Sequence, residues 1–182
     1  PGFERSDYFI YLGRLSREKG VATLLAALRR RGGGRLTCRI LGEGPLEEQL
    51  KRQARDWGLR NVEFSGYLQG EALHKAIRGA AFTVVPSEWY ENLPFAVLES
   101  FALGTPVVGS RMGGIPEMVL HEETGLTFTM GDSLELADAL DWMEARPERA
   151  VEMGRTARRL VETRYSPEEH LAQLEALYRR VA

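Results

Sequence analysis

Short apolar runs alternate along the chain with segments in which apolar residues recur at three- and four-residue spacing, the period of a helix. The runs with the length of a strand are Tyr8–Leu12, Leu36–Leu41, Val62–Phe64, Phe82–Val85, Pro106–Val108 and Gly125–Phe128. The segments with helical spacing are Val21–Leu28, Leu46–Trp57, Ala72–Ile77, Leu93–Leu103, Leu134–Met143, Glu148–Thr163 and Glu168–Val181. Because strands that alternate with helices fold as a parallel sheet covered on both faces, we expect an α/β protein with a doubly wound parallel sheet of about six strands.

Length and composition fit one domain. The 182 residues suffice for a buried core, which we expect over residues 1–165, followed by a C-terminal helix within 166–182. The formal net charge of −2 gives no sign of a nucleic-acid partner. The single cysteine, Cys38, excludes an internal disulfide and fits the reducing cytoplasm. No apolar run approaches the ~18 residues that span a bilayer.

Glycines and polar residues follow the predicted strands. Ligands of a doubly wound sheet bind at the carboxyl ends of its strands, so these segments are candidate binding loops. After the first strand come Gly13, Arg14 and then Lys19. A guanidinium fork and a point charge could hold a diphosphate there. An isolated basic loop is more often solvated surface, but a second anion site further along the chain favours binding.

That second site is the segment from Glu91 to Glu99, which carries two carboxylates across the start of an apolar helix. Pro94 suits the first turn of a helix, so Glu91 would lie on the preceding loop and Glu99 about two turns inside the helix. The free N–H groups of a helix start bind anions, and carboxylates accept hydrogen bonds from hydroxyls. Glu99 has apolar neighbours, where an unpaired carboxylate is costly, so we expect it to bind ligand hydroxyls. A sugar joined to a diphosphate offers both kinds of group.

The residues around this segment give weaker indications of a binding role. Trp89 and Tyr90 precede it, and we expect core packing for at least one of them. Gly113 and Gly114 precede a short helix and allow either close approach of a ligand or simply a tight turn. Glu117 fits an exposed acid in the first turn of that helix.

Several other chemistries lack their motifs. There is no Gly-Lys-Ser/Thr sequence, so a phosphate loop of the nucleoside-triphosphatase type is excluded. Gly42-Glu43-Gly44 is followed by Glu47 where a dinucleotide fingerprint would have its third glycine. No Asp-x-Asp pair is present for a catalytic divalent metal, and the three histidines are scattered without the spacing of metal ligands.

Taken together, these motifs resemble the C-terminal, nucleotide-sugar-binding domain of family 4 (group 1) retaining glycosyltransferases, which have the GT-B fold. The resemblance covers most of the chain, and its motifs occur in the order of the family. They are Gly13-Arg14-Leu15 with Glu18-Lys19-Gly20, Gly42-Glu43-Gly44-Pro45, Val62-x-Phe64-x-Gly66-Tyr67, Pro86-Ser87, Glu91 with Glu99, Gly104–Val108, Gly113–Glu117, and Thr124-Gly125-Leu126. The resemblance implies a Rossmann-like sheet.

The resemblance also implies roles for single residues. Arg14 and Lys19 would hold the donor diphosphate and stabilise its charge as the leaving group departs. Glu91 would contact the hydroxyls of the transferred sugar, and Glu99 would accept hydrogen bonds from the ribose. Transfer in such enzymes needs no metal, and no cofactor is expected besides the UDP-, GDP- or ADP-sugar that serves as substrate.

The other donor-binding residues implied by the resemblance lie on loops. The backbone around Leu93–Ala96 would meet sugar and phosphate, and Tyr67 with Leu68 would flank the base. The full set is Gly13, Gly42, Tyr67, Leu68, Asn92, Leu93, Pro94, Phe95 and Ala96.

Members of this family have a further, N-terminal domain that carries the acceptor site, and the resemblance does not cover it. We therefore expect this chain to be one part of a longer enzyme, to bind nucleotide weakly and to transfer nothing by itself. The apolar side of the last helix would partly face solvent without that domain. Peripheral membrane association of the full-length enzyme is a further expectation. Two alternatives stay open: a nucleotide-sugar epimerase of the same fold, and a non-catalytic nucleotide-binding module.

Overall fold

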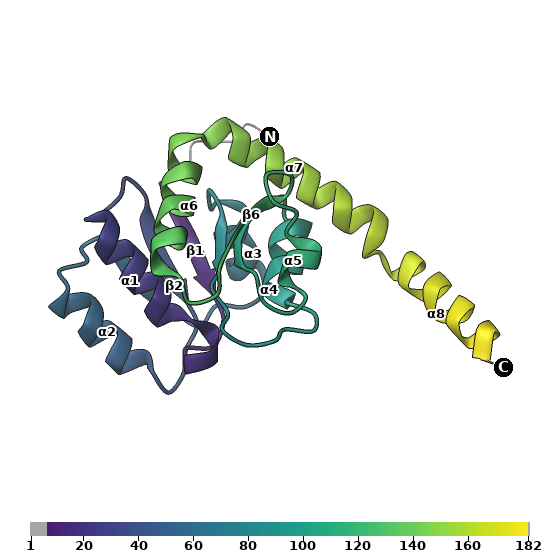
Figure 1. Ribbon diagram of the computed structural model, residues 1–182, viewed down its shortest axis with the longest axis horizontal. Helices are drawn as coiled ribbons and strands as arrows, with labels where there is room; N and C mark the ends of the chain where they lie inside the picture. Colours follow the sequence, from purple (N-terminus) through teal and green to yellow (C-terminus); the bar gives the residue numbers. More distant parts are fainter. Residues whose placement is uncertain (1–6, 182) are drawn as a thin grey trace.

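A six-stranded parallel sheet forms the centre of the protein, whose residues 7–181 are described by a computed structural model (Figure 1). The strands are β1 (Tyr8–Leu12), β2 (Thr37–Leu41), β3 (Val62–Gly66), β4 (Thr83–Val85), β5 (Val107–Ser110) and β6 (Gly125–Phe128). The helices are α1 (Val21–Arg31), α2 (Glu47–Asp56), α3 (Gly70–Arg78), α4 (Phe95–Ala102), α5 (Ile115–Met118), α6 (Ser133–Ala145), α7 (Pro147–Arg164) and α8 (Pro167–Val181). A 3₁₀ turn, η1 (Arg17–Lys19), precedes α1.

The strands lie in the order β3-β2-β1-β4-β5-β6, and every neighbouring pair is parallel. The chain therefore runs outward from β1 in one direction and outward from β4 in the other. Connections on the two sides of β1 diverge, which leaves a crevice at the carboxyl ends of β1 and β4. The predicted doubly wound, Rossmann-like sheet is confirmed.

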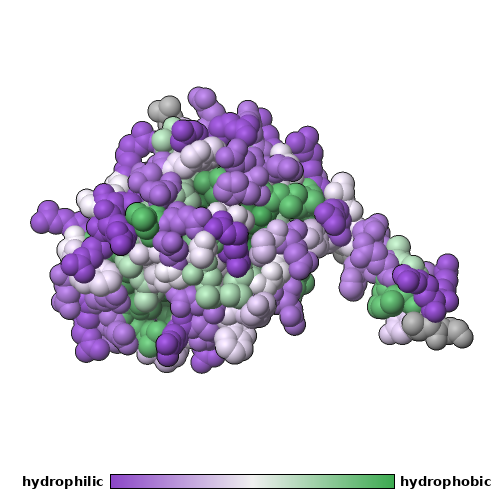
Figure 2. Space-filling model, viewed as in Figure 1, coloured by the Kyte–Doolittle hydropathy of each residue, from purple (hydrophilic) through white to green (hydrophobic). Residues whose placement is uncertain are grey.

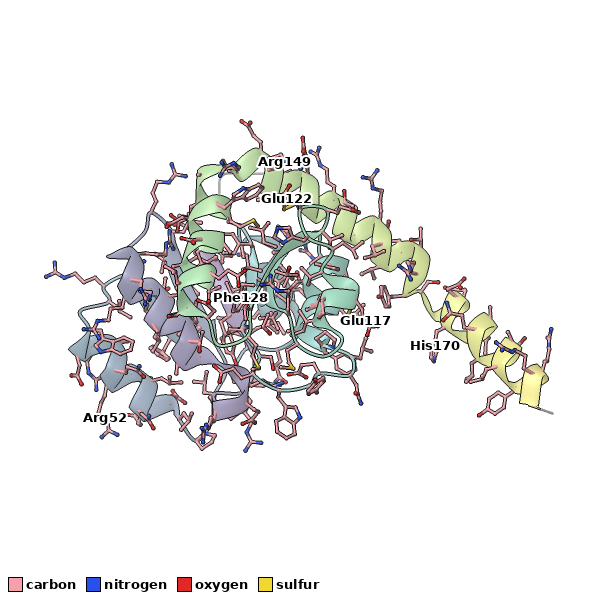
Figure 3. The ribbon with its side chains drawn as sticks, viewed as in Figure 1. Arg52, Glu117, Glu122, Phe128, Arg149 and His170 are labelled. Atoms are coloured by element: carbon pink, nitrogen blue, oxygen red, sulfur yellow. The ribbon has the colours of Figure 1, made fainter. Side chains whose placement is uncertain are left out.

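Side chains of alternate residues on each strand pack on opposite faces of the sheet. Phe9 and Tyr11 of β1 pack on the face covered by α1, α2 and α6, and the ring of Phe9 stacks on that of Phe82 at a centroid distance of 4.8 Å. Ile10 packs on the other face with Ile77 of α3, and α4, α5 and part of α7 cover the rest of that face. Figure 3 places Phe128 in the middle of the molecule and Glu117 on the outer side of α5, as its predicted exposure requires. Both faces are thus buried at the central strands β1, β4 and β5, which explains why these strands read as continuous apolar runs, whereas Glu63 and Ser65 of the edge strand β3 are exposed.

The predicted elements are present, and their ends differ by a few residues. The difference that matters is α4, which begins at Phe95 and not at Leu93. Pro94 disfavours helical backbone at the residue before it, and Pro94 itself has an extended conformation with ψ of 93°. Glu99 is consequently the fifth residue of α4, little more than one turn from its start, so the expected depth of two turns is wrong.

The last helix, α8, extends away from the rest of the protein (Figure 1). All residues from 168 to 180 are exposed, including the apolar side chains of Leu171, Leu174, Leu177 and Tyr178. Figure 2 shows apolar surface on this projecting segment. The predicted exposure of its apolar side is confirmed for these residues, whereas the side chain of Val181 lies outside the description.

Candidate functional site

The loop after β1 is held in place by backbone contacts with the ends of β1 and β2. The amide of Gly13 donates to the carbonyl of Leu41 at 3.0 Å, and the Tyr11 hydroxyl donates to the carbonyl of Arg14 at 2.8 Å. Gly42 lies directly behind: a Cβ there would be 1.9 Å from the Gly13 carbonyl oxygen, so only glycine fits. This packing leaves the Arg14 side chain exposed at the edge of the crevice.

The Tyr11 hydroxyl is kept in its protonated form. Burial raises the pKa of Tyr11, and the carboxylates of Glu18 and Glu91 raise it further because they disfavour a second negative charge nearby. Tyr11 therefore stays a hydrogen-bond donor to the loop that carries Arg14 over the physiological pH range.

The loop after β4 lies against this first loop. The amide of Glu88 donates to the carbonyl of Glu18 at 2.8 Å, and the Thr23 hydroxyl donates to the Glu88 carboxylate at 2.6 Å. These contacts bring Lys19 of the first loop to Glu91 of the second. Since β1 and β4 are adjacent in the sheet, their following loops meet although they are far apart in the sequence.

The Glu91 carboxylate accepts two hydrogen bonds through the same oxygen, Oε1. The Lys19 ammonium lies 2.5 Å from this oxygen, and the Ser87 hydroxyl donates to it at 2.9 Å. The Lys19 and Glu91 side chains are 33% and 19% exposed, so the pair lies partly shielded in the wall of the crevice. Ser87 is buried, and the hydroxyl of buried Ser110 donates to its carbonyl at 2.6 Å. Glu91 is thus held by a cation on one side and by a serine fixed to β5 on the other.

Gly113 and Gly114 support the same loop from behind. The amide of Gly114 donates to the carbonyl of Glu91 at 2.7 Å. Gly113 has φ of +56°, and a Cβ there would be 2.6 Å from the backbone nitrogen and oxygen of Glu91. Of the two roles considered for these glycines, the structure favours the tight turn, because their close approach is to the protein backbone.

The N-terminus of α4 forms the opposite wall. The carbonyl of Pro94 accepts hydrogen bonds from Val97 and Leu98, so the amides of Phe95 and Ala96 come before the first intrahelical bond. Such amides carry the partial positive charge of a helix start. The wall of the crevice at α4 is therefore suited to an anion.

A cleft of about 170 Å³ opens between these elements. Predicted site residues supply most of its lining: Gly13, Arg14, Lys19, Glu91, Pro94, Phe95 and Ala96. The remaining lining residues are Tyr11, Leu12, Val85, Pro86 and Ser87. Arg14, Lys19 and the α4 amides thus line one space together with the Glu91 carboxylate, which pairs with Lys19.

The other predicted site residues lie outside the lining of this cleft. Asn92 and Leu93 are exposed on the loop before α4, and Glu99 is half-buried, with no side-chain partner among residues 7–181. Tyr67 is 65% exposed after β3, while Leu68 packs on the cluster that contains Ile10. Tyr67 and Leu68 follow β3, and Asn92 and Leu93 lie between β4 and α4, so these four positions belong to loops after the carboxyl ends of strands.

The expectation that Trp89 or Tyr90 packs in the core is wrong. Their exposed fractions are 65% and 76%. The loop that carries them is fixed through its backbone and through Ser87, which leaves both aromatic side chains on the outside. Sequence reasoning missed Ser87, Ser110 and Tyr11 as supports of the site; the Pro86-Ser87 motif was the only signal, and it gave no role.

Neither a metal-binding cluster nor a membrane-spanning helix is present in the part of the chain that the structure describes. Within it, no three His, Cys, Asp or Glu side chains are placed to share a metal ion. No helix between residues 7 and 181 has both the length and the apolar character that a bilayer crossing requires.

The family model described as glycosyl transferases group 1 matches residues 2–160. The chain belongs to this family. Curated relatives include the glycogen synthase of Mycobacterium tuberculosis, which is 38% identical over 152 residues, covering 82% of this chain and 36% of that protein. The D-rhamnosyltransferase WbpZ of Pseudomonas aeruginosa is 33% identical, with 82% of this chain and 39% of that protein covered.

Solved structures of the glycosyl transferases agree with the fold. Sucrose-phosphate synthase from Thermosynechococcus elongatus superimposes with a TM-score of 0.85 at 30% identity, over 97% of this chain and 45% of that chain. HepE of Anabaena, solved in complex with UDP-glucose, gives a TM-score of 0.84 at 23% identity, over 97% of this chain and 50% of that chain. The group 1 transferase domain described here thus spans about a third to a half of the relatives that it matches.

Proposed function

We propose that this chain is the donor-binding domain of a retaining glycosyltransferase that transfers a hexosyl group from a nucleoside-diphosphate sugar to an acceptor. One observation carries the proposal: Arg14, Lys19 and the N-terminus of α4 surround one cleft, and the Glu91 carboxylate lies in its wall. Three sources of positive charge suit a diphosphate, and a carboxylate beside them suits sugar hydroxyls.

The arrangement also suits the chemistry of transfer. Breaking the bond between sugar and diphosphate places negative charge on the leaving phosphate and positive charge on the sugar ring. Fixed cations and helix amides aimed at the phosphate are stronger in the transition state than before it, and one such preorganised donor is typically worth about 3–4 kcal/mol. In this proposal Arg14, Lys19 and α4 supply the charge that a metal would supply in other enzymes, and Glu91 stabilises the ring.

The remaining predicted residues are assigned by their places along the same edge. Gly13 and Gly42 shape the phosphate loop, and Asn92 and Leu93 lie where the sugar would meet the loop before α4. Glu99, without a side-chain partner among the described residues, would bind the ribose. Tyr67 and Leu68 would flank the base of the UDP-, GDP- or ADP-sugar donor.

We expect no transfer by this chain alone. A cleft of about 170 Å³ is smaller than the roughly 300–1,000 Å³ that small-molecule sites occupy, which fits one wall of a larger site. The second wall would come from an N-terminal acceptor domain, and the apolar side of α8 would contact it. We place the full-length enzyme in the cytoplasm, with peripheral attachment to a membrane. The names of the relatives favour a transferase over an epimerase.

Calorimetric titration of the chain with UDP, GDP and ADP tests the proposal. We expect one of them to bind, and Arg14→Ala or Lys19→Met to weaken that binding about tenfold or more, since each removes a charged hydrogen-bond donor. Arg17→Ala is the matched control, because Arg17 is exposed in the same loop and does not line the cleft. Equal losses in Arg14→Ala and Arg17→Ala would contradict the assignment, as would binding that neither Lys19→Met nor Arg14→Ala changes. Glu99→Ala separately tests the ribose position.

A further inference from the structure

Lys19 already has an anionic partner in the wall of the cleft. Its ammonium lies 2.5 Å from Glu91 Oε1, and no other carboxylate among residues 7–181 lies within ion-pair distance of it. A diphosphate that binds to Lys19 must therefore compete with Glu91. Because both side chains are partly shielded from water, this competition is stronger than it would be between fully exposed groups.

The Glu91 carboxylate cannot simply swing away from Lys19. Ser87 donates to the same oxygen at 2.9 Å, and Ser87 is buried and held by Ser110. The backbone of Glu91 is fixed through the amide of Gly114. Glu91 thus remains within reach of Lys19, and separating the two leaves a partly buried carboxylate that needs new hydrogen-bond donors.

We propose that the Lys19–Glu91 pair makes the cleft discriminate between the intact sugar donor and the nucleoside diphosphate left after transfer. The inference rests on the proposed function of this cleft. An intact donor replaces the lost ion pair for both residues, since its phosphate pairs with Lys19 and its sugar hydroxyls donate to Glu91. A nucleoside diphosphate offers a new partner to Lys19 but none to Glu91. Once the sugar has left, Glu91 regains Lys19 and favours release of the product nucleotide.

If the Lys19–Glu91 pair acts in this way, Glu91→Gln should tighten the binding of the nucleoside diphosphate, although substitutions in a binding site usually weaken binding. The glutamine retains an oxygen for the Ser87 hydroxyl but no longer neutralises Lys19. Ion pairs of this exposure contribute up to about 1 kcal/mol, so we expect about two- to fivefold tighter binding. The preference for the corresponding nucleotide sugar over the nucleotide should shrink in the same variant, because the hydroxyls lose a charged acceptor.

Calorimetry measures both effects on the same chain, with UDP and UDP-glucose, GDP and GDP-mannose, and ADP and ADP-glucose as probes. Glu88→Gln is the matched control: it removes the same charge three residues away, and Glu88 does not line the cleft. The inference is supported if Glu91→Gln binds the nucleoside diphosphate more tightly than the unmodified chain and Glu88→Gln does not. The increase in affinity should also disappear when Glu91→Gln is combined with Lys19→Met. Thermal unfolding of each variant verifies that the fold is intact.

Two results would overturn the inference in distinguishable ways. If the unmodified chain binds a nucleoside diphosphate and Glu91→Gln binds it no more tightly, the inference fails while the donor site stands. If neither the unmodified chain nor Glu91→Gln binds any of the three diphosphates, the proposed function fails and the inference fails with it.

Discussion

The hydroxyl of Ser110 donates a 2.6 Å hydrogen bond to the carbonyl oxygen of Ser87, and both serines are buried. Strand β5 thereby holds the residue whose own hydroxyl donates to Glu91. The side chain that we assign to the sugar is supported by the neighbouring strand, so its position depends on packing that lies beneath the cleft.

We expect Ser110→Ala to destabilise the protein by about 1–3 kcal/mol, because it leaves the buried Ser87 carbonyl without this donor. Urea unfolding followed by tryptophan fluorescence measures the change. Ser65→Ala serves as control, since Ser65 is exposed on β3, and we expect a change within about 0.5 kcal/mol. Equal stability of the two variants would show that the Ser110 bond contributes nothing.

Gly113→Ala should both destabilise the protein and disturb the Glu91 loop. An alanine at φ of +56° costs about 1 kcal/mol from backbone strain, and its Cβ would also lie 2.6 Å from Glu91 backbone atoms. Gly131→Ala isolates the strain, because Gly131 has φ of +75° with no atom near the added Cβ. Only Gly113→Ala should weaken nucleotide-sugar binding in calorimetry. Similar binding by both variants would argue against the support role of this turn.

Acid should weaken the contact between Arg111 and Glu135. The Arg111 guanidinium and the Thr129 amide donate to this carboxylate, and the hydrogen bonding of Arg111 and Thr129 lowers the pKa of Glu135 to about 2 from its ordinary 4.5. A depressed pKa stabilises the fold above pH 4.5, and that contribution is lost as pH falls toward 2. Because the Glu135 side chain is 41% exposed, we expect at most about 1 kcal/mol.

Urea midpoints between pH 6 and pH 2 measure this contribution. The unmodified chain should be more stable than Glu135→Gln near pH 6, and the two curves should converge near pH 2. A constant difference over the whole range would mean that titration of Glu135 is not its cause.

Removing residues 166–182 should leave the rest of the protein as stable as before. Residues 168–180 of α8 are all exposed, so their removal takes away little buried surface. We expect the free energy of unfolding to change by less than about 0.5 kcal/mol. Trp57, Trp89 and Trp142 all remain as fluorescence probes. A loss of several kcal/mol would instead indicate that α8 packs on the domain in solution.

The strands and helices could be predicted well because the central strands β1, β4 and β5 are buried on both faces, so they stand out in the sequence as apolar runs. The start of α4 was misplaced by two residues because Leu93 looks apolar, while the conformational limit that Pro94 imposes on its neighbour decides the boundary. The exposure of Trp89 and Tyr90 could not be read from the chain. It depends on which elements cover their loop, and that is a tertiary property.

The sequence predicts candidate site residues but not the contacts between them. Arg14, Lys19 and Glu91 are such candidates, and all three line one cleft, whereas the ion pair between Lys19 and Glu91 follows from the placement of β4 beside β1. That strand order cannot be predicted from the spacing of residues in the sequence. Ser87 was likewise missed as a support, since a buried hydroxyl reveals its role only through the geometry of its acceptors.

The contacts that join the two loops of the cleft connect distant parts of the chain: Lys19 and Glu91 are 72 residues apart, and Thr23 and Glu88 are 65 residues apart. Contacts of such separation form late in folding, because the entropy of closing a long loop must be overcome first. A growing chain that has completed β1, β2 and β3 would hold Arg14 and Lys19 but neither Glu91 nor α4, and therefore no cleft. Binding competence should therefore arise only after β4 has inserted beside β1.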